Sequence, residues 1–332
     1  RYTAGMRTAP PAALAATHVE EPQRRTGPST RALVIVHLGL LCVAIIWGGN
    51  FTAIKHLLDV LHPVDIVVLR SVGGALFYLA FLIATKQVVI RVTGPDLRRM
   101  IMIGALGIPI MSLSTAYGLT RLDAGLASLL VTSNPIFTAI ISRIVLGEAL
   151  TSRKVTGILL AFAGFLVVLQ FGAAGGARME SGQIIGMLIV LAGPLAWAFY
   201  TVLSKPLLGR YPPVHVASYT TMAGGSVFVP FLVFVATLRG RMADLGAIDW
   251  LAVVYMSLLA ITVAYLLWYW GLRVLTPSQT AVYNYLVPVF GVLASWIVLG
   301  QVPTIFALLG GAVIVAGVVL TNTSSRRRLR EV

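Results

Sequence analysis

The sequence predicts an all-α integral membrane protein whose ten transmembrane helices form two inverted repeats of five helices each. The composition excludes a water-soluble domain: 58% of the residues are hydrophobic and 11% are charged, against about 25% charged residues in soluble domains. The mean hydropathy is +0.90. Two further observations define the architecture, namely ten apolar stretches of membrane-spanning length and a similarity of the chain to itself at an offset of about 150 residues.

The apolar stretches are interpreted as helices because an α-helix needs about 20 residues to cross a hydrocarbon core about 30 Å thick. Strands are excluded, since an open strand edge in lipid leaves backbone amides without partners and the stretches lack the alternation of a barrel. The predicted spans are 33–54, 63–84, 97–119, 124–146, 155–171, 182–203, 214–238, 250–270, 278–299 and 303–320.

The remaining segments predict the domain organisation and leave no room for a soluble domain. Residues 1–32 are rich in Ala, Pro, Thr and Arg and predict a disordered cytoplasmic tail. The first repeat is expected over 33–171 and the second over 182–321, joined by a Gly/Ala-rich linker at 172–181. Residues 322–332 form a basic cytoplasmic tail. The first apolar stretch is too long for the core of a signal peptide and is taken as a retained span.

The distribution of basic residues predicts that both termini lie in the cytoplasm. With that orientation, 19 of the 25 Lys and Arg residues fall in cytoplasmic segments, 5 fall outside and Arg70 lies within a span. The net charge of +14 is thereby explained by membrane orientation and not by nucleic acid. Because each repeat has an odd number of helices, the second repeat must have the opposite polarity.

The internal repeat is clearest where 122–168 is laid without gaps on 275–321, which gives 12 identities in 47 positions. Upstream, an offset of 150 pairs Trp47 with Trp197 and Lys55 with Lys205. Inverted repeats in a hydrophobic chain are typical of secondary transporters, whose substrate site lies between the repeats near the bilayer midplane.

Several motifs in this order resemble the EamA-type members of the drug/metabolite transporter superfamily. They are Trp47-Gly48-Gly49-Asn50-Phe51 with Lys55, Leu69-Arg70, Ala127-Ser128-Leu129-Leu130, Asn134-Pro135, Leu146-Gly147-Glu148, Gly157 and Gly164, and in the second half Ala281, Pro288, Leu299-Gly300-Gln301, Gly310 and Gly317. The resemblance implies a ten-helix inner-membrane transporter that exports amino acids, other metabolites or small drug-like compounds. The second half departs from the first at Gln301, which is neutral where the first half has Glu148.

Eleven acidic residues are present and none falls in the middle of a predicted span. The sequence therefore offers no mid-membrane carboxylate relay, and it predicts facilitated diffusion, exchange, or proton coupling through Glu148 alone. Glu148 lies at the cytoplasmic end of the fourth span, where it serves either a structural pairing with Arg143 or Lys154 or a gating role. Arg70 is expected to have an internal partner such as Asp65 or a helix carbonyl, with bundle pinning and substrate contact as alternatives.

Lysines and prolines at equivalent positions are the candidate gate and hinge residues. Lys55 and Lys205 either extend to the lipid headgroups or form an electropositive gate at each end of the pathway. Pro135 and Pro288 are expected to kink the fourth and ninth spans and to free the carbonyls of Val131 and Asn284. Either packing or a hinge function accounts for such kinks.

Aromatic and amide side chains are the candidate lining of the substrate site. The predicted substrate-binding residues are Trp47, Asn50, Tyr117, Trp197, Tyr200, Trp268, Tyr283 and Asn284. Those at equivalent positions, Trp47 with Trp197 and Asn50 with Tyr200, are preferred because a pseudo-twofold site draws on both repeats. Trp250 and Trp270 are assigned to the interfacial belt.

Transport of a small polar or amphipathic solute is the function that these features favour. No catalytic or metal-binding motif occurs, so we expect neither an enzyme nor a cofactor or bound metal, and the single Cys42 excludes an internal disulfide. The partners expected are a small-molecule substrate and the lipid bilayer, with the protein a monomer or a homodimer. A flippase for lipid or lipid-linked cargo, or a carrier of nucleosides or sugar derivatives, is the alternative.

Overall fold

The computed structural model of the chain describes residues 29–87, 90–119, 130, 132–171, 183–234, 236–299 and 305–323. In this part every element is helical. The elements are α1 (Thr30–Leu58), α2 (Pro63–Ala84), α3 (Gly94–Leu119), α5 (Asn134–Leu146), α6 (Ser152–Phe171), α7 (Gln183–Leu208), α8 (Pro213–Ser226), α9 (Val229–Phe234), α10 (Ala236–Ala243), α11 (Ala247–Val254), the π-helix η1 (Tyr255–Val263), α12 (Ala264–Val274), α13 (Pro277–Ala281), the 3₁₀ helix η2 (Val282–Tyr285), α14 (Leu286–Leu299) and α15 (Ile305–Thr323).

Within the described residues, five helical stretches are long and apolar enough to cross a membrane. They are Thr30–Asn50, Pro63–Ala84, Gly94–Tyr117, Leu188–Leu208 and Ala247–Val274, and two shorter apolar helices accompany them at Asn134–Leu146 and Leu308–Thr323. The chain is thus a helical protein with several apolar helices of spanning length. The arrangement as ten spans in two repeats stays a prediction.

Most predicted spans coincide with a helix, and α2 has the predicted bounds of 63–84. The first helix is longer than predicted: α1 begins at Thr30, because the side chain of Ser29 accepts a hydrogen bond from the N–H of Ala32 at 3.2 Å and caps the helix. Its first turn therefore occupies the end of the predicted tail. The rest of that tail, the predicted linker and residues 324–332 lie outside the described residues.

The seventh predicted span, 214–238, is not one continuous helix. It consists of α8, α9 and α10, and α8 ends at Ser226. The physical reason is Pro230, whose ring excludes a helical carbonyl four residues earlier, at Ser226. Two glycines, Gly224 and Gly225, immediately precede this break and add backbone freedom there.

The expectation that Pro135 kinks the interior of a helix is wrong, whereas a kink at Pro288 stays a prediction. Pro135 lies in the first turn of α5, where a missing N–H costs no helical hydrogen bond. Pro288 is the third residue of α14, which follows η2 directly, so the helix type changes from α to 3₁₀ and back just before this proline. The N–H of Leu286 is directed at the carbonyls of Tyr283 and Asn284, so the Asn284 carbonyl is not free. Val131 lies outside the described residues.

The eighth span is a single helical rod, 247–274, with a wider π-helical centre at η1. Two side chains from the first half of the chain donate to carbonyls of this centre: the Trp47 indole to Ala260 O at 2.9 Å and the Tyr78 hydroxyl to Thr262 O at 2.8 Å. A π-helical segment inside an α-helix often marks a functional site. Here it joins the second half of the chain to α1 and α2.

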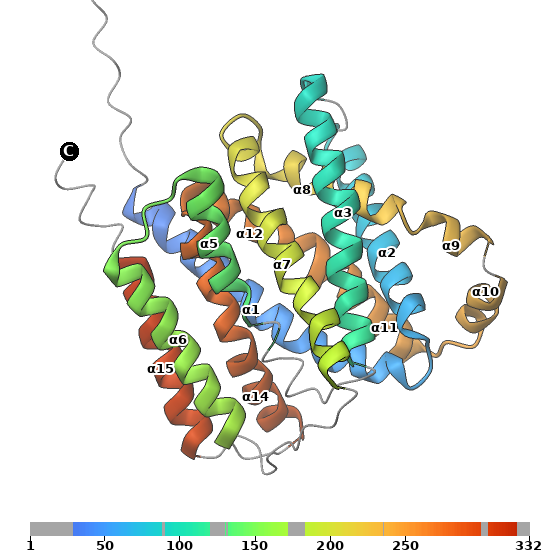
Figure 1. Ribbon diagram of the computed structural model, residues 1–332. Helices are drawn as coiled ribbons and strands as arrows, with labels where there is room; N and C mark the ends of the chain where they lie inside the picture. Colours follow the sequence, from blue (N-terminus) through green and yellow to red (C-terminus); the bar gives the residue numbers. More distant parts are fainter. Residues whose placement is uncertain are drawn as a thin grey trace, which may run out of the picture.

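Helices α6 and α15 run side by side at one edge of the bundle, with α14 next to them, while α9 and α10 lie at the opposite edge (Figure 1). Glycines permit the close approach of α6 and α15. A Cβ atom at Gly164 would lie 2.7 Å from Gly310 O, and one at Gly317 would lie 2.5 Å from Ala161 N. The small residues therefore set the spacing of this pair, as is common in membrane helices.

Candidate functional site

The centre of the bundle holds six aromatic side chains, which we call the aromatic cluster. Its members are Trp47 of α1, Trp197 and Tyr200 of α7, and Tyr265, Trp268 and Tyr269 of α12. Residues three or four apart project from the same face of a helix, so the α7 and α12 members form two facing aromatic surfaces. All except the half-buried Trp47 are at most 5% exposed.

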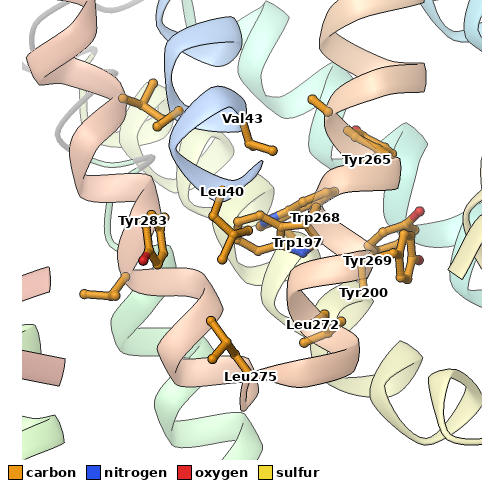
Figure 2. Packing of buried hydrophobic residues seen from close by; sticks show 14 of the residues in the cluster. Leu40, Val43, Trp197, Tyr200, Tyr265, Trp268, Tyr269, Leu272, Leu275 and Tyr283 are labelled. Atoms are coloured by element: carbon orange, nitrogen blue, oxygen red, sulfur yellow. The ribbon is translucent and has the colours of Figure 1, made fainter. Parts of the chain in front are cut away.

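Trp197 lies at the middle of the aromatic cluster. Its ring centroid is 5.4 Å from that of Trp47, 5.5 Å from Trp268, 5.1 Å from Tyr265 and 5.0 Å from Tyr200. Figure 2 shows Trp197 and Trp268 together, with Leu40 and Val43 of α1 beside them. Aromatic pairs at these separations stabilise packing and present π surfaces. The aromatic cluster thus joins α1, from the first half of the chain, to α7 and α12 from the second.

A chain of hydrogen-bonded hydroxyl groups lines one side of the aromatic cluster. The Tyr200 hydroxyl lies 2.8 Å from Thr220 Oγ1, which lies 3.3 Å from the Tyr269 hydroxyl, and that group lies 3.0 Å from Ser204 Oγ. These contacts fix the orientation of Tyr200 and Tyr269. Of the other members, only Trp47 has a side-chain hydrogen bond among the described residues, to Ala260 O.

Buried polar atoms without a hydrogen-bond partner among the described residues occur around the same cluster. They are the indole Nε1 of Trp197 and of Trp268, the hydroxyl of Tyr265, Asn50 Oδ1 and Arg70 Nε. Buried polar groups are normally paired, and unpaired ones are costly. A polar solute or water is the partner that such groups require. These atoms give the apolar centre the few polar groups that a pocket for an amphipathic molecule needs.

Arg70 does not pair with Asp65, one of the partners expected from the sequence. Asp65 forms an ion pair with Arg241 of α10, with Arg241 Nε and Asp65 Oδ2 2.6 Å apart. The two α2 residues are five positions apart, so their side chains do not share a helix face in the way that residues three or four apart do. Arg70 itself is 8% exposed. Its only identified electrostatic neighbour in the described part of the chain is Tyr265 of the aromatic cluster.

A second polar group lies where α5, α7 and η2 meet. Asn284 Nδ2 donates to Asn134 Oδ1 at 2.8 Å, and Asn134 Nδ2 donates to Pro194 O at 3.0 Å. Tyr283, the neighbour of Asn284, pairs its hydroxyl with His37 Nδ1 of α1 at 2.6 Å. Figure 2 shows Tyr283 on a different ribbon from the aromatic cluster. These contacts join the two halves but engage the very groups that were expected to receive substrate.

Glu148 is the centre of a buried network beside the first turn of α13. Lys154 Nζ donates to Glu148 Oε1 at 2.7 Å, Ser142 Oγ donates to Oε2 at 2.5 Å, and the Ser278 hydroxyl also donates to Oε1. Lys154 Nζ is further 3.4 Å from Thr276 Oγ1. We call these five residues the Glu148 network. It connects the end of α5 and the start of α6 to the second half of the chain.

The electrostatic environment of Glu148 favours its charged form. Burial raises the pKa of its carboxyl group, but hydrogen bonds from Lys154, Ser142, Ser278 and Thr276 outweigh this, so the pKa lies below its ordinary value of 4.5. Of the two cations that the sequence offered as partners, Lys154 forms the ion pair.

Lys205 caps the C-terminal end of α12. Its Nζ donates to the carbonyls of Leu272 at 2.5 Å, Leu275 at 2.7 Å and Arg273 at 3.2 Å. A lysine here satisfies carbonyls that the end of a helix leaves unpaired and is favoured by the helix dipole. The side chain of Lys55, its counterpart, lies outside the described residues.

The structure thus brings together only part of the predicted site. Trp47, Trp197, Tyr200 and Trp268 join the aromatic cluster, whereas the 39% exposed Tyr117 has its ring near His62, with centroids 6.4 Å apart. Trp250 and Trp270 are 38% and 50% exposed on the outside of the bundle. Among the described residues, no three His, Cys, Asp or Glu side chains gather so that they could hold a metal ion.

Several contributors were missed from the sequence. Tyr265 is three residues before Trp268 and four before Tyr269, and this spacing alone places it on their helix face. Asn134 precedes a repeated proline and was noted only as part of a motif. His37 and Ser278 carry no local signal, since their partners, Tyr283 and Glu148, are 246 and 130 positions away.

Comparison with known proteins identifies the family. The model of the EamA-like transporter family matches the chain twice, over residues 34–170 and 184–323. The chain therefore belongs to the EamA-like transporter family, and the resemblance found in the motifs is confirmed. An uncharacterized transporter of Archaeoglobus fulgidus is 29% identical over 272 residues, which cover 82% of this chain and 93% of that protein.

Two further relatives bear on function and fold. A probable terminal-alkyne amino-acid exporter of Streptantibioticus cattleyicolor is 29% identical over 293 residues, covering 88% of this chain and 95% of that protein. A crystal structure of a protein that is 22% identical superposes with a TM-score of 0.73 and covers 90% of this chain and 99% of that one. The fold is therefore one already seen in a solved structure.

Proposed function

We propose that this member of the EamA-like transporter family exports small amphipathic metabolites, such as amino acids or related compounds, across the cell inner membrane. Transport would proceed by alternating access between two inverted five-helix repeats, with both termini in the cytoplasm and without a cofactor. The stretches 34–170 and 184–323, which match the same family model, support the assignment of two repeats.

The observation that carries the proposal is the aromatic cluster with its unpaired polar atoms. Rings from both halves of the chain offer an apolar surface, while Trp197 Nε1, Trp268 Nε1 and Tyr265 OH offer donors that lack partners in the described part of the chain. A small solute with an apolar body and polar ends matches both features. The similarity to a probable amino-acid exporter favours an amino acid among such solutes.

The direct test is uptake of labelled solutes into inverted membrane vesicles that contain the protein. Labelled amino acids are expected to accumulate, and vesicles without the protein give the background. Labelled nucleosides and a fluorescent phospholipid test the alternative cargoes in the same vesicles. Accumulation of a nucleoside or lipid without any amino acid would replace the proposed substrate class.

Substitutions locate the site. Trp47→Ala and Asn284→Ala are expected to raise the half-saturating concentration several-fold or to abolish transport, because one removes a ring from the aromatic cluster and the other breaks the contact with Asn134. Trp250→Ala is the matched control, since this tryptophan faces outward. If all three variants insert at normal levels and the control is the damaged one, the site has been placed wrongly.

A further inference from the structure

Arg70 is a buried cation whose charge no described acid balances. It lies in the second turn of α2, is 8% exposed, and its Nε has no hydrogen-bond partner among the described residues. Arginine keeps its proton at any physiological pH, so the group cannot avoid the cost of burial by becoming neutral. A buried charge within a membrane span needs an opposite charge or backbone carbonyls around it, and a bound anion can supply the opposite charge.

The described acidic residues are committed elsewhere or lie on the surface. Asp65 pairs with Arg241, Asp96 with Arg210, Glu148 with Lys154, and Asp249 with His56. The two others in the described part of the chain, Asp59 and Asp244, are exposed. A structural counter-ion for Arg70 is therefore absent from this part of the chain.

The position of Arg70 connects it to the proposed site. The guanidinium is near enough to Tyr265 for the two groups to influence each other electrostatically, and the Tyr265 ring centroid lies 5.1 Å from that of Trp197 and 6.2 Å from that of Trp47. One turn further along α2, Gly74 lies against Ile261 and accepts a hydrogen bond from Thr262 at 3.5 Å, so this part of α2 packs on the π-helical centre of the eighth span. Arg70 thus lies in the half of α2 that precedes this packed region, near Tyr265 of the aromatic cluster.

We propose that Arg70 binds the carboxylate of the transported solute while the aromatic cluster receives its apolar part. This inference rests on the proposed function and narrows its substrate class to solutes with an anionic group. A guanidinium offers a carboxylate two parallel hydrogen bonds, and the low polarity of the surroundings strengthens them. Solutes of the same shape without the negative charge leave Arg70 unpaired and are discriminated against.

The test compares three probes that share one side chain: phenylalanine, phenylalaninamide and 2-phenylethylamine. Uptake into proteoliposomes is measured for the wild type, Arg70→Gln, Arg70→Lys and a control, Arg153→Gln, which changes an exposed arginine at the start of α6. The wild type and the control are expected to transport phenylalanine and to discriminate against the other two probes. Arg70→Gln is expected to raise the half-saturating phenylalanine concentration about ten- to hundredfold.

A binding measurement separates a lost site from a damaged fold. Phenylalanine is expected to raise the melting temperature of the detergent-solubilised wild type and of Arg153→Gln, but not that of Arg70→Gln, while Arg70→Lys recovers part of the effect because it keeps a positive charge. If Arg70→Gln is too unstable to purify, Arg70→Lys alone is decisive: a lysine lacks the paired donors, so unchanged affinity for phenylalanine would overturn the proposal.

The outcomes also distinguish this inference from the proposed function. Equal transport of phenylalanine and phenylalaninamide by the wild type, or unaltered phenylalanine transport by Arg70→Gln, would overturn the role of Arg70 and leave amphipathic transport standing. A wild type that transports and binds none of the three probes, nor any other amino acid, would overturn both.

Discussion

The ion pair of Glu148 and Lys154 gives a stability prediction whose size follows from its burial. The two side chains are 6% and 9% exposed, and 2.7 Å separates Glu148 Oε1 from Lys154 Nζ. Removing one partner of a buried pair leaves the other charge without compensation and costs about 3–5 kcal/mol. Glu148→Gln does this to Lys154, whose Nζ keeps, among the described residues, the contact with Thr276 Oγ1 at 3.4 Å.

The reverse change has a smaller effect. Lys154→Met leaves the Glu148 carboxylate with donors from Ser142 and Ser278, so its cost is expected at the lower end of that range, about 3 kcal/mol. The double variant removes both charges at once. Its loss is expected to be at least about 2 kcal/mol smaller than the sum of the two single losses, because no unpaired charge remains.

The assay is the free energy of unfolding of detergent-solubilised protein, followed by tryptophan fluorescence during titration with a denaturing detergent. Arg143→Gln is the control, because Arg143 is the exposed basic residue of α5. Single losses below about 0.5 kcal/mol, or a double loss equal to the sum of the single losses, would refute the reasoning.

The pH dependence provides an independent check on Glu148. Its pKa is lower in the folded protein than its ordinary value of 4.5, so the unfolded state binds the proton more readily. The network therefore contributes its full stability above pH 4.5 and loses it as the pH falls through the lowered pKa. Wild-type stability should decline in this range, and Glu148→Gln should lack this part of the decline.

Two further predictions concern topology and packing. In a Cys42→Ser background, a cysteine placed at Arg239 should react with an impermeant thiol reagent applied outside the cell, and one at Arg91 should not. The reason is that the distribution of basic residues favours cytoplasmic termini. External labelling at position 91 would contradict the ten-helix topology. Gly164→Leu should reduce the amount of folded protein, because its Cβ would lie 2.7 Å from Gly310 O. Gly94→Leu should be tolerated, because the space around its Cβ position is open. Equal yields of the two variants would show that α6 and α15 are not closely packed in the membrane.

The sequence predicted the helices well where hydrophobicity alone decides. Lipid forces the backbone to satisfy its own hydrogen bonds, so a long apolar stretch such as 63–84 has few alternatives to a helix. It predicted interruptions poorly. A proline shows that a helix is perturbed, but whether it bends a continuous helix or begins a new one depends on tertiary packing, which led to the wrong expectation for Pro135.

The aromatic part of the site was predictable because repetition and helical spacing both point to it. Trp47 and Trp197 were paired by the internal offset, and their rings lie 5.4 Å apart. Polar partners were not predictable in the same way. Asp65 is near Arg70 in sequence but pairs with Arg241, a residue 176 positions further along the chain, and no local pattern reports a contact of that separation.

The contacts between the two halves of the chain constrain how such a protein would open. At the end predicted to face outward, the pairs His56–Asp249 and Asp65–Arg241 each contain a partner that is 45% or 40% exposed, so water can replace the broken contact at little cost. At the other end, Ser278 donates to a buried carboxylate, and each charge-assisted bond lost costs about 1.5–3 kcal/mol.

This asymmetry favours a resting state that is closed at the Glu148 end, which is the end predicted to face the cytoplasm. An exported solute arrives from that side, so it must bind the state that is open there more tightly than the closed state. A ligand shifts an equilibrium only by its difference in affinity for the two states. For the bond from the Ser278 hydroxyl alone, that difference must be about ten- to hundredfold. An ionic contact at Arg70 is of this size, whereas contact with a single aromatic ring is weaker. A charged group on the solute would therefore both select the substrate and offset the cost of opening the end from which it enters.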